Sequence, residues 1–422
     1  MNRKAAKSNT AINNPSFCHA ISLFIENIES LKIAFPLVTE TILSSHKISL
    51  DNLKQLKDSI TVKNKGADKV KATPEEIKQY VKLQKENKSF ERAASTLKRS
   101  FIVSLVSQFD IHISQLIRTM FYIKPAMLNS SEKIFKFSEL IEFGTIEAVQ
   151  EHLIEKEIET VLRESHSKQF EWLEKKLGVK TFKDSPTWPT FIEITERRNL
   201  FVHCDGIISS QYINVCKNNK VSIDDKNQIG HKLDVSEKYF EDAYKCMFEV
   251  GVILAQTIWR KLNPNDSEKA NNNLHTVCID LIKNEEYDLA RKILDFANTD
   301  IIKKSFSEKY KFMFLINKAQ TLKWSGEDEK AIEILGGIDW SACSSEFKLV
   351  KAVLLDDFDE AAKLMLRVGK NSEILSIENY KFSPAFREFR KSTSFIETYE
   401  KIFDEPFLVE QTSSIIMNEA VS

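Results

Sequence analysis

The N-terminal part of the chain carries apolar residues three and four positions apart, which predicts amphipathic helices. The pattern starts at Phe17. Pro36 predicts the start of a second helix that runs towards Leu56, because proline is favoured in the first turn of a helix. The polar residues 63–69 predict a loop. Thr73 is followed by a proline and two glutamates, which predicts a helix start with the threonine hydroxyl as its cap.

The same periodicity continues to residue 262 and is interrupted by polar, proline-containing or glycine-containing stretches. The first expected elements are one long helix over 89–123, two amphipathic helices within 130–178 and a break at 184–189. A helix is expected from about Thr190 to Cys204, with Gly206 placed to end it. A polar loop or small hairpin over 217–235 and a helix over 236–262, capped by Ser236, complete this part.

The polar stretch 263–267 predicts a boundary, and three similar units follow it at 284–294, 325–335 and 355–365. Each unit has a polar turn and then an alanine shortly before an aliphatic pair. The step from Ala290 to Ala331 is 41 residues, and the step to Ala361 is 30. These units resemble tetratricopeptide repeats, which pair helices at small residues and stack into a solenoid. A plain α-helical bundle is the alternative interpretation.

Composition favours a helical protein with sizeable cores. Of the 422 residues, 42% are hydrophobic and 29% are charged, and there are only 10 glycines and 9 prolines. The net charge of −1 argues against a protein that coats nucleic acid over its whole surface. Residues 47–88 hold eleven lysines against six acids, which indicates either a solvated helix face or a patch that steers RNA phosphates.

The scattered cysteines and histidines show no zinc-binding spacing, and no glycine-rich phosphate loop occurs. We therefore expect no metal and no cofactor. The cysteines are interpreted as reduced thiols, and Cys204 as a packing residue. The N-terminus lacks the apolar core of a signal peptide, and no run of 18 apolar residues occurs. The expected location is cytoplasmic, without a membrane partner.

The candidate chemistry lies between 196 and 206, where Arg198, Asn199 and His203 occur close together. The arginine fork matches two phosphate oxygens, and histidine can accept and return a proton near neutral pH. RNA carries its own nucleophile in the 2′-hydroxyl group, so these groups can cleave it without a metal. Asn199 can orient the imidazole or bind phosphate. A helix-end salt bridge with a core histidine is the structural alternative.

Helix geometry argues for a site built from two chains. Asn199 and His203 lie one turn apart, whereas the directions of Arg198 and His203 differ by about 140° on an ideal helix. One helix therefore makes a poor complete site. Two copies that meet at a two-fold axis would supply every group twice, which predicts a homodimer. Arg197 also fits the arginine position; Arg198 is favoured because Asn199 follows it.

The sequence RNLFVH at 198–203 resembles the ribonuclease motif of the HEPN superfamily, in which an arginine and a polar residue precede a histidine. The flanking residues 104–118 and 137–179 resemble the second helix and the middle of the HEPN group found with prokaryotic toxins and phage-defence systems. This resemblance implies a metal-independent endoribonuclease with an all-helical fold and a dimeric active site. It also makes Asp110 an auxiliary candidate, with His112 a weaker one. Asp110 and His112 are two residues apart and cannot share one face of a helix, so we expect one of them to point to solvent.

The expected fold is all-α, with a HEPN-like helical bundle followed by helix–turn–helix repeats. The expected domains are an N-terminal helical region at 1–98, a ribonuclease domain at 99–262 and repeats at 268–405. The expected function is RNA cleavage in a toxin or antiviral-defence role, with a protein trigger or inhibitor bound by the repeats. The alternative is an adaptor that binds RNA or a nucleotide without cutting it. Relatives that are silenced by modification carry a tyrosine two residues after the histidine; here that residue is Asp205.

Overall fold

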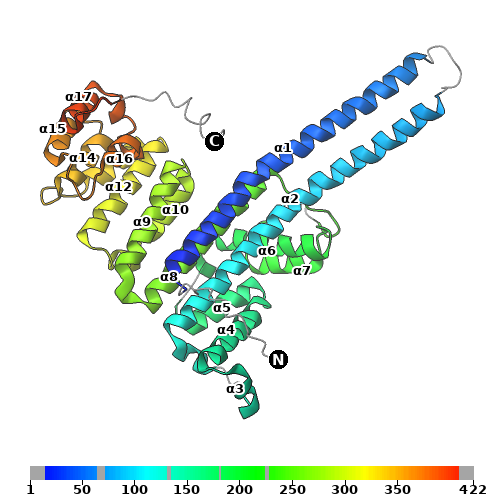
Figure 1. Cartoon of the computed structure of the whole chain (residues 1–422), viewed down its shortest axis with the longest axis horizontal. Coiled ribbons are helices and arrows are strands. Elements are labelled where there is room, and N and C mark those ends of the chain that lie inside the picture. The colour runs from blue at the N-terminus through cyan, green and yellow to red at the C-terminus, as the bar shows by residue number, and fades with distance from the viewer. Residues whose placement is uncertain (1–14, 64–71, 131–134, 180–181, 224–227, 408–422) are drawn as a thin grey trace, which may run out of the picture. The chain divides into compact units, whose positions relative to one another are not determined.

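The computed structural model describes residues 15–63, 72–130, 135–179, 182–223 and 228–407 (Figure 1). Within these ranges the fold is all-α, as predicted, and no strand occurs. A single isolated backbone bridge pairs Ile207 with Lys232. The chain divides into two compact units between Pro264 and Asn265, which lie inside the polar stretch 263–267.

The first unit contains eight α-helices in its described part. They are α1 (Phe17–Lys63), α2 (Pro74–Ile123), α3 (Phe137–Phe143), α4 (Ile146–Leu162), α5 (His166–Leu177), α6 (Trp188–His203), α7 (Ser210–Asn218) and α8 (Glu237–Leu262), with short 3-10 helices at Pro125–Ser130 and Phe182–Asp184.

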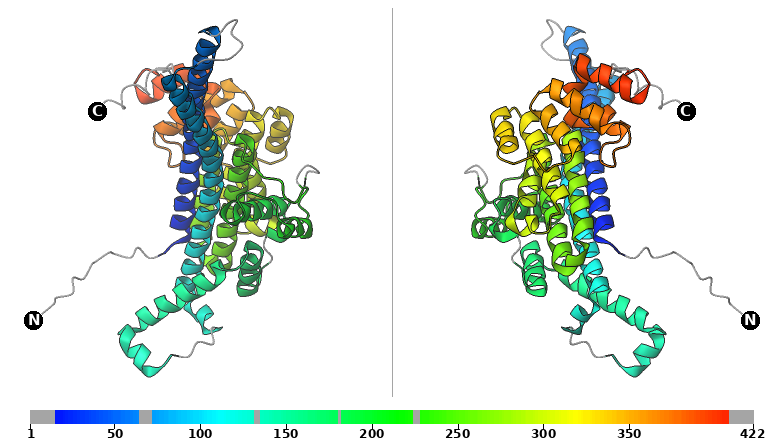
Figure 2. Two further views of the ribbon diagram at one scale, coloured as in Figure 1. Left: turned by 90° about the vertical axis from the view of Figure 1, so that its right-hand side faces the viewer. Right: turned by 90° about the vertical axis from the view of Figure 1, so that its left-hand side faces the viewer.

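Helices α1 and α2 lie side by side along their length, and their far ends project beyond the other helices of this unit (Figure 1, Figure 2). In the projecting part, one series of buried and half-buried positions is spaced alternately four and three residues apart, which is the spacing of a coiled coil. These positions are 35, 39, 42, 46, 49, 53, 56 and 60 on α1 and 76, 80, 83, 87, 90 and 94 on α2.

The predicted helix start at Thr73 is confirmed. Its hydroxyl accepts a hydrogen bond from the amide of Glu76 at 3.2 Å, and the Glu76 carboxylate accepts one from the amide of Thr73 at 2.8 Å. Helix α2 therefore begins at Pro74 rather than at 89. The residue pair 98/99, where the sequence suggested a domain boundary, lies inside this helix. Of the predicted loop 63–69, residues 64–69 lie outside the described ranges.

The predicted helix start at Pro36 is wrong, because α1 continues through this residue. A proline inside a helix removes one backbone hydrogen bond, but packing on either side holds α1 together. The ring of Phe35 stacks on Phe240 of α8 with 4.1 Å between centroids, and Thr39 is buried. The Thr39 hydroxyl also donates to the carbonyl of Phe35 at 2.8 Å.

The core of the first unit lies where α2 packs against α1, α6 and α8. Residues of α2 between Ile102 and Phe121 supply much of it, as do Phe24 of α1 and the buried face of α8. Among the described helices, only α2 is long and apolar enough to pass a length-and-composition test for a membrane span. Its apolar face, however, packs against neighbouring helices of the same unit.

Three helices rather than two occupy the segment predicted as 130–178. Gly144 adopts a φ of 75° and ends α3, and the Thr145 side chain caps α4 by accepting from the amide of Ala148. Ser165 then precedes α5. The extra break follows from Gly144, since a positive φ does not fit a continuing helix. The predicted loop 217–235 is partly helical, because α7 extends to Asn218.

The described part of the second unit consists of α-helices of 4 to 17 residues. They are α9 (Ser267–Lys283), α10 (Tyr287–Ala297), α11 (Asp300–Lys303), α12 (Glu308–Trp324), α13 (Asp328–Gly336), α14 (Ser345–Leu354), α15 (Phe358–Val368), α16 (Ile377–Phe382) and α17 (Thr393–Phe403), with 3-10 helices at Pro264–Asp266, Pro384–Phe386 and Phe389–Lys391.

The three similar sequence units form three turns with the same backbone geometry. Glu285, Gly326 and Asp356 occupy matching positions with φ values of 59°, 81° and 58°. In each turn the next amide donates to a carbonyl five residues back, at 2.9, 2.9 and 3.0 Å. The matching alanines at 290, 331 and 361 are all buried. Each turn joins two packed helices: α9 to α10, α12 to α13, and α14 to α15.

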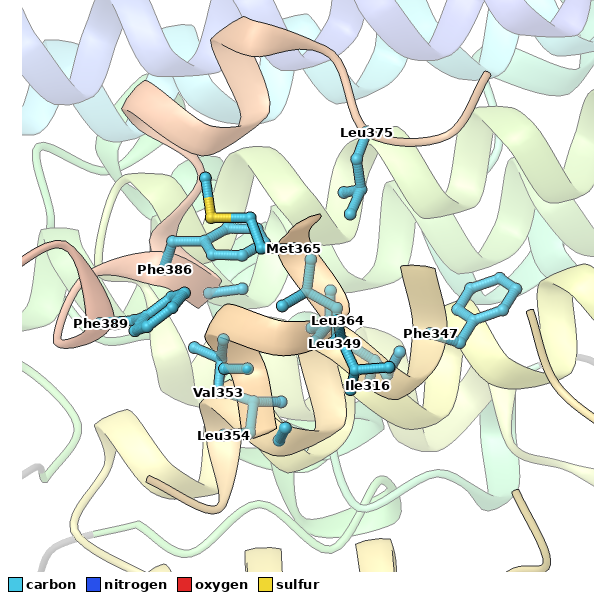
Figure 3. Close-up of a cluster of buried hydrophobic side chains, with 14 of the residues drawn as sticks. Ile316, Phe347, Leu349, Val353, Leu354, Leu364, Met365, Leu375, Phe386 and Phe389 are labelled. Carbon is cyan, nitrogen blue, oxygen red and sulfur yellow. The ribbon is translucent and has the colours of Figure 1, made fainter. Parts of the chain in front are cut away.

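A cluster of aliphatic and aromatic side chains fills the later part of this unit (Figure 3). Met365, Phe386 and Phe389 lie close together within it, and Leu349 and Leu364 lie beside them. The Phe389 ring also meets Phe395 of α17 edge-on. This helix therefore closes the apolar cluster at the end of the described chain.

Candidate functional site

Helix α6 carries the predicted arginine and histidine, and its limits agree with the helix expected from about 190 to 204. Trp188, Phe191, Ile192 and Thr195 are buried on one face. The helix ends at His203, and the turn that follows has two positive φ values, 49° at Asp205 and 80° at Gly206. The amide of Gly206 donates to the carbonyl of Leu200 at 3.0 Å, so the predicted glycine is part of the turn that ends the helix. A side chain here would also come within 3.1 Å of the Leu233 carbonyl oxygen, so the position requires glycine.

The turn after α6 is held by Asp205, which accepts from two cationic side chains. Arg99 of α2 donates to one carboxylate oxygen at 2.7 Å, and Lys232 donates to the other. These hydrogen bonds hold the pKa of Asp205 below its usual range, with Lys232 making the larger contribution. Asp205, two residues after His203, is therefore tied to two other segments.

His203 is the last residue of α6, and its side chain is exposed. Cys204 is exposed as well, so its interpretation as a packing residue is wrong. The neighbouring apolar side chains of Val202 and Ile207 are 49% and 43% exposed. The imidazole thus lies on an accessible surface that also presents aliphatic groups.

Arg198 points into a small cluster of polar groups from three helices. One terminal nitrogen donates to Oδ2 of Asp110 on α2 at 3.2 Å, and the other donates to Oδ1 of Asn199 at 3.2 Å. The second oxygen of Asp110 lies 3.0 Å from Nε2 of His166, the first residue of α5. The side chains of Arg198 and Asp110 are 25% and 24% exposed, so this ion pair is only partly buried.

Glu196 adds a second carboxyl group to this cluster, which we call the Arg198 cluster: Asp110, His166, Glu196, Arg198 and Asn199. Burial raises the pKa of Glu196 above its ordinary value, and the charge of His166 and a hydrogen bond with Asn199 oppose this shift. The cluster therefore combines one arginine, one histidine and two carboxyl groups in a partly buried setting.

Arg197 is held in a different network. Its Nε donates to Glu193 at 2.7 Å, and Tyr212 and Tyr239 each donate a hydroxyl hydrogen bond to the same carboxylate at 2.7 Å. The guanidinium also lies 3.9 Å from the centroid of the Tyr239 ring. Burial would lower the pKa of Arg197, but Tyr239 and Glu193 outweigh burial and raise it.

The Arg197 and Glu193 side chains are only 13% and 12% exposed. We therefore interpret Arg197 as a structural residue that joins α6 to α7 and α8. Of the two arginines that fit the motif, Arg198 is the one that faces a polar and accessible cluster.

Asp110 and His112 both turn towards neighbouring helices, so the expectation that one of them points to solvent is wrong. Asp110 meets Arg198, whereas His112 is fully buried with Nε2 3.2 Å from the carbonyl oxygen of Gly251. Its ring stacks on Phe24, with 4.3 Å between centroids. Burial lowers the pKa of His112 to about 4, which marks it as a neutral core residue.

The lysine-rich segment 47–88 forms the outer part of the α1–α2 pair. Its described and exposed lysines are Lys47, Lys54, Lys57, Lys78, Lys82, Lys85 and Lys88. Exposure fits both a solvated face and a patch that attracts phosphates. Among the residues that the structure describes, no three histidine, cysteine or acidic side chains gather as a metal site requires.

The chain matches no protein-family model, no curated protein and no solved structure. Its own residues therefore carry the functional interpretation.

Sequence reasoning did not find His166, Glu196 or the tyrosine partners of Glu193. A signal for His166 was present, because it precedes Phe170, Leu173 and Leu177 on the apolar face of α5. A histidine on such a face needs a partner for its ring nitrogens. The identity of that partner depends on how α2, α5 and α6 pack, which spacing along the chain does not encode.

Proposed function

We propose that this protein is a metal-independent endoribonuclease whose site combines Arg198, Asn199 and His203 from two copies of the chain. The observation that carries the proposal is the position of Arg198. Its guanidinium is anchored by Asp110 and Asn199, its side chain is a quarter exposed, and the same helix carries an exposed imidazole. An anchored arginine and a titratable imidazole, brought together from two chains, suit binding and proton transfer at a phosphodiester.

The proposed reaction is a transesterification. The 2′-oxygen attacks phosphorus while one His203 accepts the 2′-hydroxyl proton. The bond from phosphorus to the 5′-oxygen breaks, and the other protomer's histidine returns a proton to that oxygen. Arg198 stabilises the extra charge on the phosphorane. The products are a 2′,3′-cyclic phosphate and a 5′-hydroxyl group, and no oxidant, metal or cofactor takes part.

The surface around His203 supports a two-chain site. Val202 and Ile207 expose aliphatic groups on either side of the imidazole in sequence, and interface cores are rich in apolar area. An isologous contact here would bring two His203 side chains near one axis. The same contact would also bury the exposed side chains of Val202 and Ile207.

The repeat-like second unit is proposed to bind a protein trigger or inhibitor. Its three matching turns and buried alanines favour a tetratricopeptide-like solenoid over an irregular bundle. A pocket of about 630 Å³ between α10, α12 and α13 offers a docking place, lined by Arg291, Lys318 and Glu327 together with Leu315 and Ile334. A regulated RNase fits a cytoplasmic toxin or phage-defence effector, a role that rests on the family resemblance.

A second function is favoured by one observation. Asp110 already neutralises part of the Arg198 charge, which weakens this arginine as a stabiliser of a phosphorane. A HEPN-like adaptor that holds RNA or a nucleotide without cutting it would tolerate this ion pair.

The test is incubation of the full chain with total RNA in EDTA. We expect cleavage by wild type and loss of cleavage in Arg198→Ala and His203→Ala. Matched controls are Arg163→Ala, an arginine that is 77% exposed, and His19→Ala, an exposed histidine of α1. Equal cleavage by all five proteins would reject the site. RNA binding by wild type without cleavage would favour the adaptor.

A further inference from the structure

The Arg198 cluster contains a histidine that the proposed reaction does not use. His166 is the first residue of α5, and its side chain is 9% exposed. Its ring lies 5.8 Å from Phe191 and 6.2 Å from Phe109, measured between centroids. RNA cannot reach an imidazole enclosed in this way, so a direct catalytic role is excluded.

The polar contact of His166 points to a second role. Its Nε2 lies 3.0 Å from Oδ1 of Asp110, and Oδ2 of the same carboxylate receives the hydrogen bond from Arg198. One carboxylate thus bridges two donors from α5 and α6. We infer that His166 is a positioning residue of the proposed ribonuclease site, which fixes Asp110 so that only one carboxylate oxygen engages Arg198.

This inference rests on the proposed function and explains how Arg198 can bind phosphate beside an acid. A carboxylate without a second donor can pair with a guanidinium through both oxygens and occupy two of its N–H groups. With Oδ1 held by His166, Asp110 takes one terminal nitrogen of Arg198 and Asn199 takes the other. The remaining N–H groups of the terminal nitrogens stay available to a phosphate.

Two substitutions separate positioning from packing. His166→Phe keeps an aromatic ring between Phe109 and Phe191 but removes the donor. His166→Gln removes the ring but places an amide N–H near the position of Nε2. A positioning role requires that glutamine preserves function and phenylalanine does not. A packing role requires the reverse.

The first readout is RNA cleavage by the full chain. We expect His166→Phe to lower kcat by about 10- to 100-fold, the effect of misplacing a catalytic group by about 1 Å, with a smaller change in KM. Recovery of most of this activity is expected in His166→Gln. Cleavage by His166→Phe at the wild-type rate would overturn the inference.

The second readout does not depend on RNA cleavage. The Nε atom of Arg198 is buried and has no hydrogen-bond partner, so its proton is shielded from solvent. In ¹⁵N-arginine NMR spectra, assigned with Arg198→Lys, we expect this signal in wild type and His166→Gln and its shift or broadening in His166→Phe. An unchanged signal in all three proteins rejects positioning. A changed signal in a protein that never cleaves RNA rejects only the ribonuclease proposal.

Discussion

Arg197 and Arg198 are adjacent in sequence, yet we predict opposite consequences when each is replaced. Methionine is the replacement in both cases because it keeps much of the aliphatic stem of arginine. Arg197→Met should lower the free energy of unfolding strongly and leave the Arg198 cluster intact. Arg198→Met should lower it little but remove the proposed phosphate contact.

The magnitudes follow from burial. Arg197→Met leaves the carboxylate of Glu193, which is 12% exposed, with only its two tyrosine donors. Breaking a buried ion pair by removing one partner costs about 3–5 kcal/mol. The Arg198–Asp110 pair is about a quarter exposed on each side, and pairs near the surface contribute about 1 kcal/mol or less. The two variants should therefore differ by about 2–4 kcal/mol.

Hydrogen exchange measured by mass spectrometry is the suitable assay, because the chain has two units and global unfolding need not be two-state. We expect amides of α7 and α8 to exchange at least about 30-fold faster in Arg197→Met than in Arg198→Met, since 1.4 kcal/mol corresponds to a factor of ten. Helices α9 to α17 serve as the internal control and should exchange alike in both variants. Equal exchange in α7 and α8, or faster exchange in Arg198→Met, would refute the structural role of Arg197.

Three further predictions concern stability. Folding lowers the pKa of His112 from 6.5 to about 4, so the unfolded chain binds more protons than the folded chain between these pH values. The free energy of unfolding of wild type should therefore fall by about 3 kcal/mol from pH 6.5 to pH 4, and it should fall less in His112→Gln. Urea titrations at both pH values measure this difference. Gly251→Ala places a methyl group 2.3 Å from the Phe24 ring and should lower the melting temperature of the first unit. An unchanged melting temperature would mean that the Phe24 ring can move aside at no cost in stability. In Gly326→Ala the added methyl group meets no atom within 4 Å, but residue 326 has a φ of 81°, so the substitution should lower the free energy of urea unfolding by about 1 kcal/mol. Gly336→Ala is the control, with equal space and no positive φ, and should lower it less. Equal effects would contradict the strained-turn explanation.

Local signals in the sequence predicted the elements that depend on neighbouring residues. The cap at Thr73, the glycine in the turn after α6 and the helical periodicity were all predictable, because caps and positive φ values are properties of a few adjacent residues. Pro36 shows the limit of such signals. Stacking of Phe35 on Phe240, some 200 positions away in the chain, keeps α1 continuous where the local rule predicts a helix start.

The candidate site shows the same division. The motif located Arg198, Asn199 and His203, and a resemblance added Asp110. The partner of His166 could not be predicted from the sequence, because Asp110 lies 56 positions away and the two meet only through the packing of their helices. The sequence left Arg197 and Arg198 as alternatives. The structure separates them, because Arg197 pairs with Glu193, a carboxylate that Tyr212 and Tyr239 also bind.

The central claim is that a cation and an imidazole from each of two identical chains act on a single phosphodiester. The most direct measurement uses wild type and His203→Ala coexpressed with different affinity tags, followed by isolation of the mixed dimer. If both histidines serve one site, the mixed dimer should cleave RNA no faster than the His203→Ala homodimer. Activity at half the level of the wild-type homodimer would show two independent sites and contradict the claim.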